Sequence, residues 1–82
     1  MSDDRHVYER LQSVFDRVFL DEVKVSPQLS AKDVDEWDSL LHVTLILLVE
    51  KEFGIRFATG EVEATENVGE LVTLVLRHLE GG

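Results

Sequence analysis

One stretch of the chain, Leu40 to Val49, is apolar over almost its whole length and limits the folds that the chain can adopt. Eight of its ten side chains are leucine, isoleucine or valine. We expect a helix from Leu41 to Phe53 that ends at Gly54, because glycine adopts the left-handed conformation that closes many helices. A helix that is apolar all around is buried on most sides. In a chain of 82 residues it cannot be buried on all of them, so part of this helix must face solvent.

Two further segments show the period of amphipathic helices and supply surfaces that would cover this helix. The first runs from about Asp4 to Leu20. The last begins after Asn67, where Glu70 follows three residues later as in a capping box. The apolar stripes are Val7, Leu11, Val14, Phe15 and Val18 in the first segment, and Val68, Leu71, Val72, Val75 and Leu79 in the last.

Residues 21–37 form a long connection between the first two helices. They sustain no period, and Pro27 with Ser26, Gln28 and Ser30 gives them the composition of a loop. Unstructured connections of this length are uncommon in compact domains and are usually functional or disordered. We predict that the loop is pinned to the helices and delivers the residues after it to a fixed place on the surface. Its apolar anchors are Val25, Leu29, Val34 and Trp37.

The expected fold is therefore all-α, a small bundle with three main helices, one short helix and a long loop between the first two. The short helix is expected at Gly60 to Glu63, with Thr59 as its cap and Val62 as its buried anchor. The length fits a single free-standing domain that spans residues 1–82, with its core at about residues 5–80.

Composition excludes several classes of function. The chain has no cysteine, so it contains neither disulfides nor thiolate metal sites. Its net charge of −9 and pI near 4.6 disfavour nucleic acid and anionic membranes as partners, and favour proteins with basic docking patches. No segment is long enough to span a bilayer, and Asp3 and Asp4 stand where a signal peptide carries basic residues. We therefore expect a cytoplasmic protein, and a monomer.

The triplet Asp38-Ser39-Leu40 comes directly before the apolar run. Asp38 is a good N-cap residue, because its carboxylate accepts hydrogen bonds from the unpaired amides of the first turn. Ser39 then lies at the rim of that turn, where the helix dipole tolerates an anion such as a phosphate. Taken alone, these three residues favour an ordinary capping serine.

With a long polar loop before the triplet and an apolar helix after it, the chain resembles the acyl and peptidyl carrier proteins. The resemblance runs from about Val7 to Leu79 and rests on the Asp-Ser-Leu motif at the start of the second helix. It implies a helical bundle in which Ser39 carries 4'-phosphopantetheine, attached from coenzyme A by a phosphopantetheinyl transferase that Asp38 and Leu40 assist. It also implies that acyl or aminoacyl groups are held as thioesters on this arm and presented to successive biosynthetic enzymes. Such a carrier is not itself an enzyme.

We predict that the second helix also contains the docking surface for these partners, on an outward face made of Leu41, Thr44, Leu48 and Lys51. Fatty-acid members of the family usually carry acidic residues where this chain has Leu41 and Thr44. The difference favours a dedicated pathway, such as polyketide, peptide or specialised acyl transfer. The inward face is expected to contain Val43, Ile46 or Leu47, Glu50 and Phe53. Six apolar residues are candidates for lining a cargo cavity, although each of them fits a role in the plain core better: Val43, Leu47, Phe53, Ile55, Val62 and Val72.

Other functions fit the sequence less well. Carboxylates alternate between Asp33 and Asp38 as at the start of a calcium loop, but the turn glycine and closing glutamate of such a loop are missing. His42 lies one turn after Ser39, yet no orienting acid or oxyanion hole is visible, so we expect neither catalytic residues nor metal ligands. Two alternatives remain. One is a helical adaptor that never receives a prosthetic group, and the other is a sulfur carrier ending in Gly81-Gly82, whose β-grasp fold the helical periods disfavour.

Overall fold

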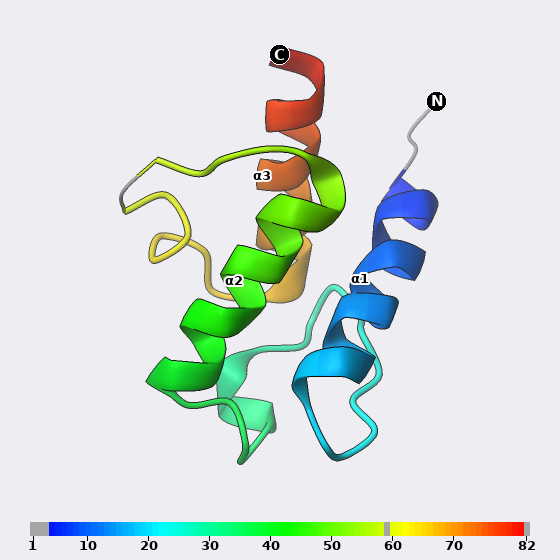
Figure 1. The fold of residues 1–82 in the computed structure, drawn as a ribbon, viewed down its shortest axis with the longest axis vertical. Helices are drawn as coiled ribbons and strands as arrows, with labels where there is room; N and C mark the ends of the chain where they lie inside the picture. Colours follow the sequence, from blue (N-terminus) through cyan, green and yellow to red (C-terminus); the bar gives the residue numbers. More distant parts are fainter. Residues whose placement is uncertain (1–3, 59, 82) are drawn as a thin grey trace.

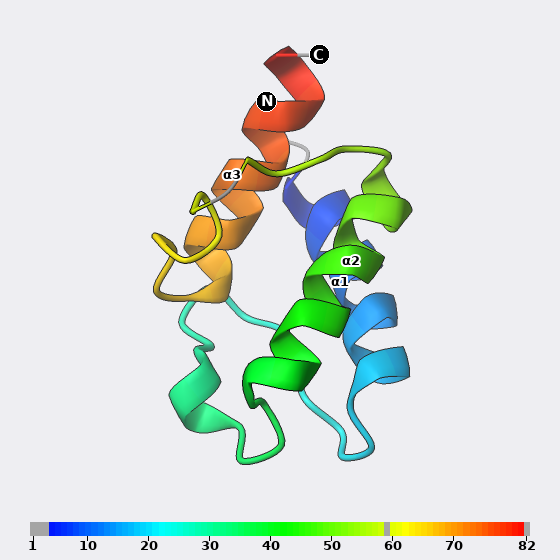
Figure 2. The same ribbon diagram turned by 60° about the vertical axis from the view of Figure 1, so that its left-hand side comes forward.

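The computed structural model describes residues 4–58 and 60–81 (Figure 1). Three α-helices form the fold, α1 (Asp4–Val18), α2 (Ser39–Phe53) and α3 (Val68–Gly81), and a 3-10 helix, η1 (Ala31–Asp33), lies in the first loop. Figures 1 and 2 show that α1 runs antiparallel to α2 and α3. The described residues contain no strand, and the predicted all-α fold is confirmed.

The core lies where the three helices meet. The stripe predicted for α1 is buried except at Val18, which is half-buried against the same core. The helix ends two residues earlier than predicted, so that Phe19 folds into the core while Leu20 stays 96% exposed. The clustered core residues are Val7, Leu11, Val14, Phe15, Phe19, Val23, Leu45, Val49, Phe53, Val68, Val72 and Val75.

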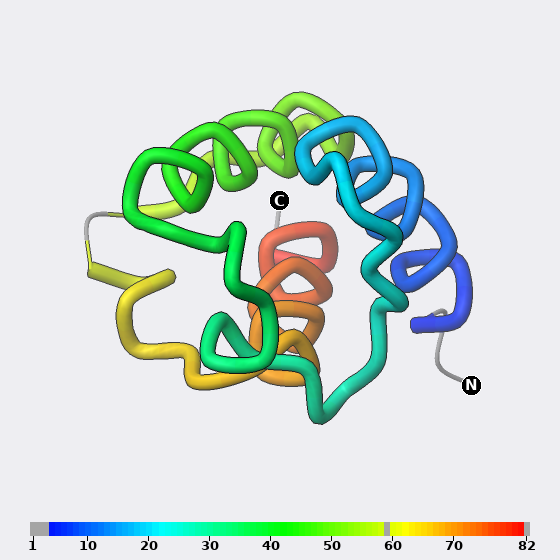
Figure 3. The backbone as a smooth tube through the Cα atoms, turned by 90° about the horizontal axis from the view of Figure 1, so that it is seen from below, coloured from blue at the N-terminus to red at the C-terminus, as the bar shows by residue number. Residues whose placement is uncertain are grey.

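The long loop between α1 and α2 is pinned to the bundle as predicted, and it passes across the lower end of all three helices (Figure 3). The side chain of Gln12 holds its first part. The Gln12 amide donates to the Val23 carbonyl at 2.7 Å, and its oxygen accepts from the Val25 amide at 2.9 Å. The predicted anchors are half-buried against the core, namely Val25, Leu29, Val34 and Trp37.

The same loop helps to start α3. The first amides of a helix have no partner within it, and here the amides of Val68 and Gly69 donate to the carbonyls of Leu29 (2.8 Å) and Pro27 (3.0 Å). A Cβ atom on Gly69 would stand 3.0 Å from the Pro27 oxygen, so glycine permits this close approach. The loop and α3 are therefore joined through their backbones.

The predicted start of α3 is confirmed, but the burial predicted near its C-terminal end is not. Asn67 caps the helix as predicted and accepts from the Glu70 amide at 2.9 Å, whereas the Glu70 carboxylate accepts from the Glu66 amide instead of closing the box. Leu79 is 44% exposed, so its predicted place in the core is wrong. The last turn of α3 extends beyond the ends of α1 and α2 (Figure 2). Leu74 is buried instead.

The prediction of a short helix at Gly60 to Glu63 is wrong. Residues 60–64 form turns, and Gly60 has a φ of +90°, which α-helices do not accommodate. Its expected cap, Thr59, lies outside the described residues. Val62 is buried as predicted, so the segment is anchored without being helical. The short helical element of the fold is η1 in the first loop.

The predicted rotation of α2 is also wrong, although its ends are confirmed. Phe53 faces inward as expected, but Val43 and Leu47 are 58% and 56% exposed. Leu41 and Leu48, predicted to face outward, are half-buried and pack against the core. The inward face is centred on Leu45, Val49 and Phe53. Because the helix is apolar almost all around, the sequence contains no amphipathic period that would fix its rotation.

Candidate functional site

Ser39 is the first residue of α2 and is exposed. Asp38 caps the helix as predicted, and its carboxylate accepts from the Leu41 amide at 2.9 Å. The Ser39 hydroxyl makes no hydrogen bond to any part of the chain that the structure describes. The site therefore presents a free hydroxyl at the positively polarised end of a capped helix.

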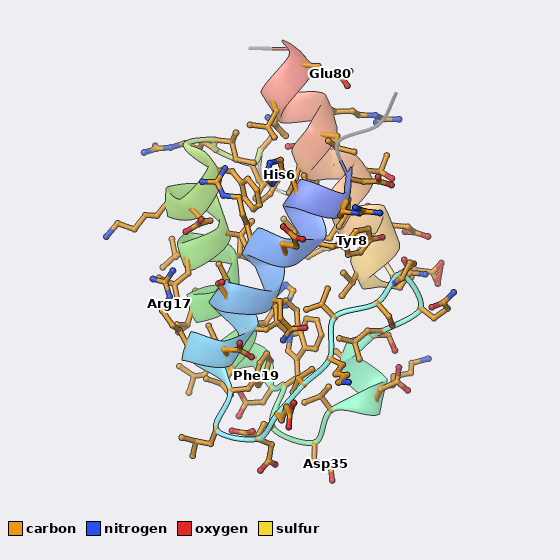
Figure 4. The ribbon with its side chains drawn as sticks, turned by 90° about the vertical axis from the view of Figure 1, so that its right-hand side faces the viewer. His6, Tyr8, Arg17, Phe19, Asp35 and Glu80 are labelled. Atoms are coloured by element: carbon orange, nitrogen blue, oxygen red, sulfur yellow. The ribbon has the colours of Figure 1, made fainter. Side chains whose placement is uncertain are left out.

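The residues just before Ser39 are fixed from several sides. The Glu36 carboxylate accepts from the amides of Leu20 and Asp21 at 3.1 and 2.9 Å, which ties the loop to the end of α1. Trp37 packs edge-on against Phe15 at 5.5 Å between ring centroids. Figure 4 shows Asp35 at the outer tip of this loop. Ser39 thus stands on a corner that is held to α1.

The His42 side chain pairs with Trp37. Its Nδ1 atom accepts a hydrogen bond from the Trp37 indole at 3.1 Å, and the two rings stack with centroids 6.2 Å apart. Sequence reasoning identified Trp37 as a loop anchor, which is confirmed, but missed its pairing with His42. The one signal of this pairing in the sequence is that Trp37 and His42 are five residues apart, and this spacing can be interpreted only when the path of the loop is known.

An exposed apolar strip starts beside Ser39 and follows the outer face of α2. We define it as Leu40, Val43 and Leu47, which are 79%, 58% and 56% exposed. Thr44 and Lys51, which were predicted to face outward, are exposed next to it. The first turn of α2 contains no acidic residue after its cap. This face of an otherwise acidic protein is therefore apolar and nearly uncharged.

Two open grooves flank the apolar strip. One, of about 310 Å³, lies between α2 and residues 57–58 and 60–63, and Val43, Leu47 and Val62 help to line it. The other, of about 610 Å³, lies at the end of α2, where Ile55 contributes. Four of the six residues predicted to line a cargo cavity therefore line these grooves. The remaining two, Phe53 and Val72, belong to the core.

The second connection, after α2, is held by Glu61. Its carboxylate accepts from the Ala58 amide at 2.7 Å and lies 2.9 Å from His78 Nε2 on α3. These hydrogen bonds lower the pKa of Glu61 below its usual value, and the one from the Ala58 amide has the largest effect. Within the described ranges, no three His, Cys, Asp or Glu side chains gather as a metal site would require. None of the helices in those ranges is long and apolar enough to cross a membrane.

Comparisons with known proteins show to which family the chain belongs. No family model matches it. An acyl carrier protein of Rubrobacter xylanophilus is 34% identical over 77 residues, which are 93% of this chain and 95% of that protein. The solution structure of a holo acyl carrier protein from Geobacter metallireducens superposes with a TM-score of 0.77 at 36% identity, covering 99% of this chain and 90% of that one. The fold, the exposed serine at the start of α2 and these likenesses together show that the chain belongs to the acyl carrier protein family.

Proposed function

We propose that this protein carries acyl or aminoacyl groups on a 4'-phosphopantetheine arm attached to Ser39. The observation that supports the proposal is the exposed and unbonded Ser39 hydroxyl at the capped start of α2, in a member of this family. When bound, phosphopantetheine supplies a thiol that holds an acyl group as a thioester. Members of this family are carriers, and the chemistry on the cargo belongs to partner enzymes.

The residues around Ser39 suit an attached phosphate. A phosphodiester adds negative charge at the start of α2, which the helix dipole favours. The cap does not depend on the Ser39 hydroxyl, because the Asp38 carboxylate holds the Leu41 amide. In the attachment, Ser39 Oγ would form a bond to phosphorus while the pyrophosphate bond of coenzyme A breaks and adenosine 3',5'-bisphosphate leaves. The hydroxyl proton would pass to a base on the transferase, since His42 Nδ1 is engaged by Trp37.

The apolar strip, Leu40, Val43 and Leu47, is the proposed contact surface for the phosphopantetheinyl transferase. An enzyme that reaches the Ser39 hydroxyl also covers the next turns of α2, and these carry the strip. Thr44 and Lys51 remain in the predicted docking face. Leu41 and Leu48 border that face, and their half-buried side chains support α2 from beneath.

The cargo is proposed to belong to a dedicated biosynthetic pathway, with polyketide, peptide or specialised acyl transfer as the candidates. The support is the outer face of α2, whose first turn carries no acidic residue and so departs from the acidic face usual in fatty-acid carriers. Holo protein offered to an acyltransferase of fatty-acid synthesis should therefore be loaded more slowly than a fatty-acid carrier. Equal rates would contradict this part of the proposal.

Intact mass measurement tests the attachment. The protein is incubated with coenzyme A, magnesium and a broad-specificity transferase, in parallel with Ser39→Ala and with Ser13→Ala, which changes another exposed serine. The parent and Ser13→Ala should gain the mass of one phosphopantetheine group, and Ser39→Ala should gain nothing. If the folded parent stays unmodified while a control carrier reacts in the same tube, the carrier role is refuted and the unmodified adaptor becomes the better account.

A further inference from the structure

The contact between Trp37 and His42 defines the state of the histidine. An indole N–H is a donor only, so the His42 Nδ1 atom, 3.1 Å away, must be the acceptor. The imidazole is therefore neutral in this arrangement, with its proton on Nε2. The rings lie at 24° to one another, so they are stacked as well as hydrogen-bonded.

This pair joins the two sides of the Ser39 corner. On the loop side, Trp37 packs against Phe15 and Phe19 at centroid distances of 5.5 and 5.7 Å. On the helix side, His42 is the residue whose amide donates to the Asp38 carbonyl at 2.8 Å and closes the first turn of α2. The hydrogen bond between the side chains therefore closes a ring of contacts around Ser39.

We propose that His42 is a positioning residue for Ser39 that acts through Trp37, and that a proton on His42 Nδ1 releases this hold. Protonation converts the acceptor into a donor that faces another donor, so the hydrogen bond cannot persist. Histidine is the side chain that changes charge near neutral pH. The consequence for Ser39 rests on the proposed function, whereas the state of the pair does not.

Charged groups face His42 on two sides. Glu66 lines a small cavity of about 70 Å³ together with His42, and Glu50 and Glu63 line the 310 Å³ groove with it. The Glu50 carboxylate is already engaged by the Phe57 amide at 2.8 Å. Asp38 and the positive end of α2 lie one turn before His42. On the side of α1, Trp37 packs against the aromatic rings of Phe15 and Phe19.

Two variants separate the hydrogen bond from the ring. In His42→Asn the side-chain oxygen replaces Nδ1 as acceptor and does not titrate, and in His42→Phe the ring remains without an acceptor. Trp37 is the only tryptophan, so its fluorescence reports on the pair directly. Between pH 8 and pH 5 the emission of the parent should change in one proton step, while that of His42→Asn stays flat. His42→Phe at pH 8 should resemble the parent at pH 5.

Nitrogen-15 NMR at pH 8 supplies an independent measure, and it should show the Nε2–H tautomer of His42. An Nδ1–H tautomer, or a parent emission curve that coincides with that of His42→Asn, would overturn the proposed hold. His6 and His78 are present in all three proteins, so their effects cancel from the comparison.

The effect on Ser39 is measured as kcat/KM for phosphopantetheinyl transfer to the parent, divided by the value for His42→Asn at the same pH. This ratio removes the pH dependence of the transferase. It should fall about 2- to 10-fold from pH 8 to pH 5.5, the effect of one hydrogen bond, mainly through KM. If this ratio stays constant with pH while the Trp37 emission changes, the positioning of Ser39 by His42 is refuted. If the parent protein is never modified at pH 8, the proposed function is refuted instead. The Trp37 emission and the His42 tautomer would still test the hydrogen bond between Trp37 and His42.

Discussion

Leu47 and Leu48 are adjacent in α2, yet truncation of each should affect a different property. Leu47 is 56% exposed on the apolar strip, and Leu48 is half-buried against the core. Full burial of a leucine side chain contributes about 1.5–3 kcal/mol. If the transferase covers the exposed part of Leu47, the contact contributes about 0.8–1.5 kcal/mol to binding, since that is roughly half of the full value. Leu47→Ala should therefore lower kcat/KM for modification about 4- to 13-fold.

The stability of the two variants is the matched control. Leu47→Ala should change the free energy of unfolding by less than about 0.5 kcal/mol, as surface substitutions do. Leu48→Ala should lower it by about 1–2 kcal/mol, because part of a packed side chain is removed. Thermal unfolding by circular dichroism measures both, and modification is followed by intact mass over time. A Leu47→Ala variant that is modified at the parental rate, or that melts as low as Leu48→Ala, would refute the assignment of the strip.

Three further changes test the core, the cap and the second connection. Leu45→Ala should lower the free energy of unfolding in urea by about 2–5 kcal/mol, because Leu45 is fully buried. Asp38→Ala should lower it by about 0.5–2 kcal/mol through loss of the cap of α2; an unchanged urea midpoint would argue against the cap. The lowered pKa of Glu61 means that its carboxylate stabilises the fold above the ordinary glutamate pKa of 4.5, and that this contribution is lost as pH falls through the lowered value. Glu61→Gln should therefore lose less stability than the parent between pH 7 and pH 3, and equal losses in the two proteins would contradict the role of its bonds to Ala58 and His78.

The ends of α2 are predictable from single residues because caps act locally. An aspartate before a helix accepts first-turn amides whatever the rest of the fold does, and Asp38 does so here. Glycine takes the left-handed conformation without steric cost, and Gly54 closes α2 with a φ of +65°. The position of Ser39 at the start of the helix follows from the same local chemistry. This part of the site needed no knowledge of the tertiary structure.

The rotation of α2 and the pairing of Trp37 with His42 depend on tertiary structure. A helix with clear polar and apolar faces reveals its orientation, as α1 does, but the apolar run of α2 offers several faces of similar hydrophobicity. The contacts with α1 and α3 select Leu45 and Val49 for the core. Trp37 reaches His42 only because the loop turns back beneath the start of α2. Neither result is contained in a local pattern.

Once Leu45, Val49 and Phe53 are buried, helical geometry turns Leu40 and Leu47 to the opposite side. Folding does not require leucine there, because a polar side chain at an exposed helix position costs little stability. A contiguous exposed apolar strip is instead typical of a binding surface. The chain has 17 acidic residues and a net charge of −9, yet the strip carries none of them. The proposed partner would match both the strip and the acidic surface around it if it had an apolar centre and a basic surround, and this complementarity would orient it over Ser39.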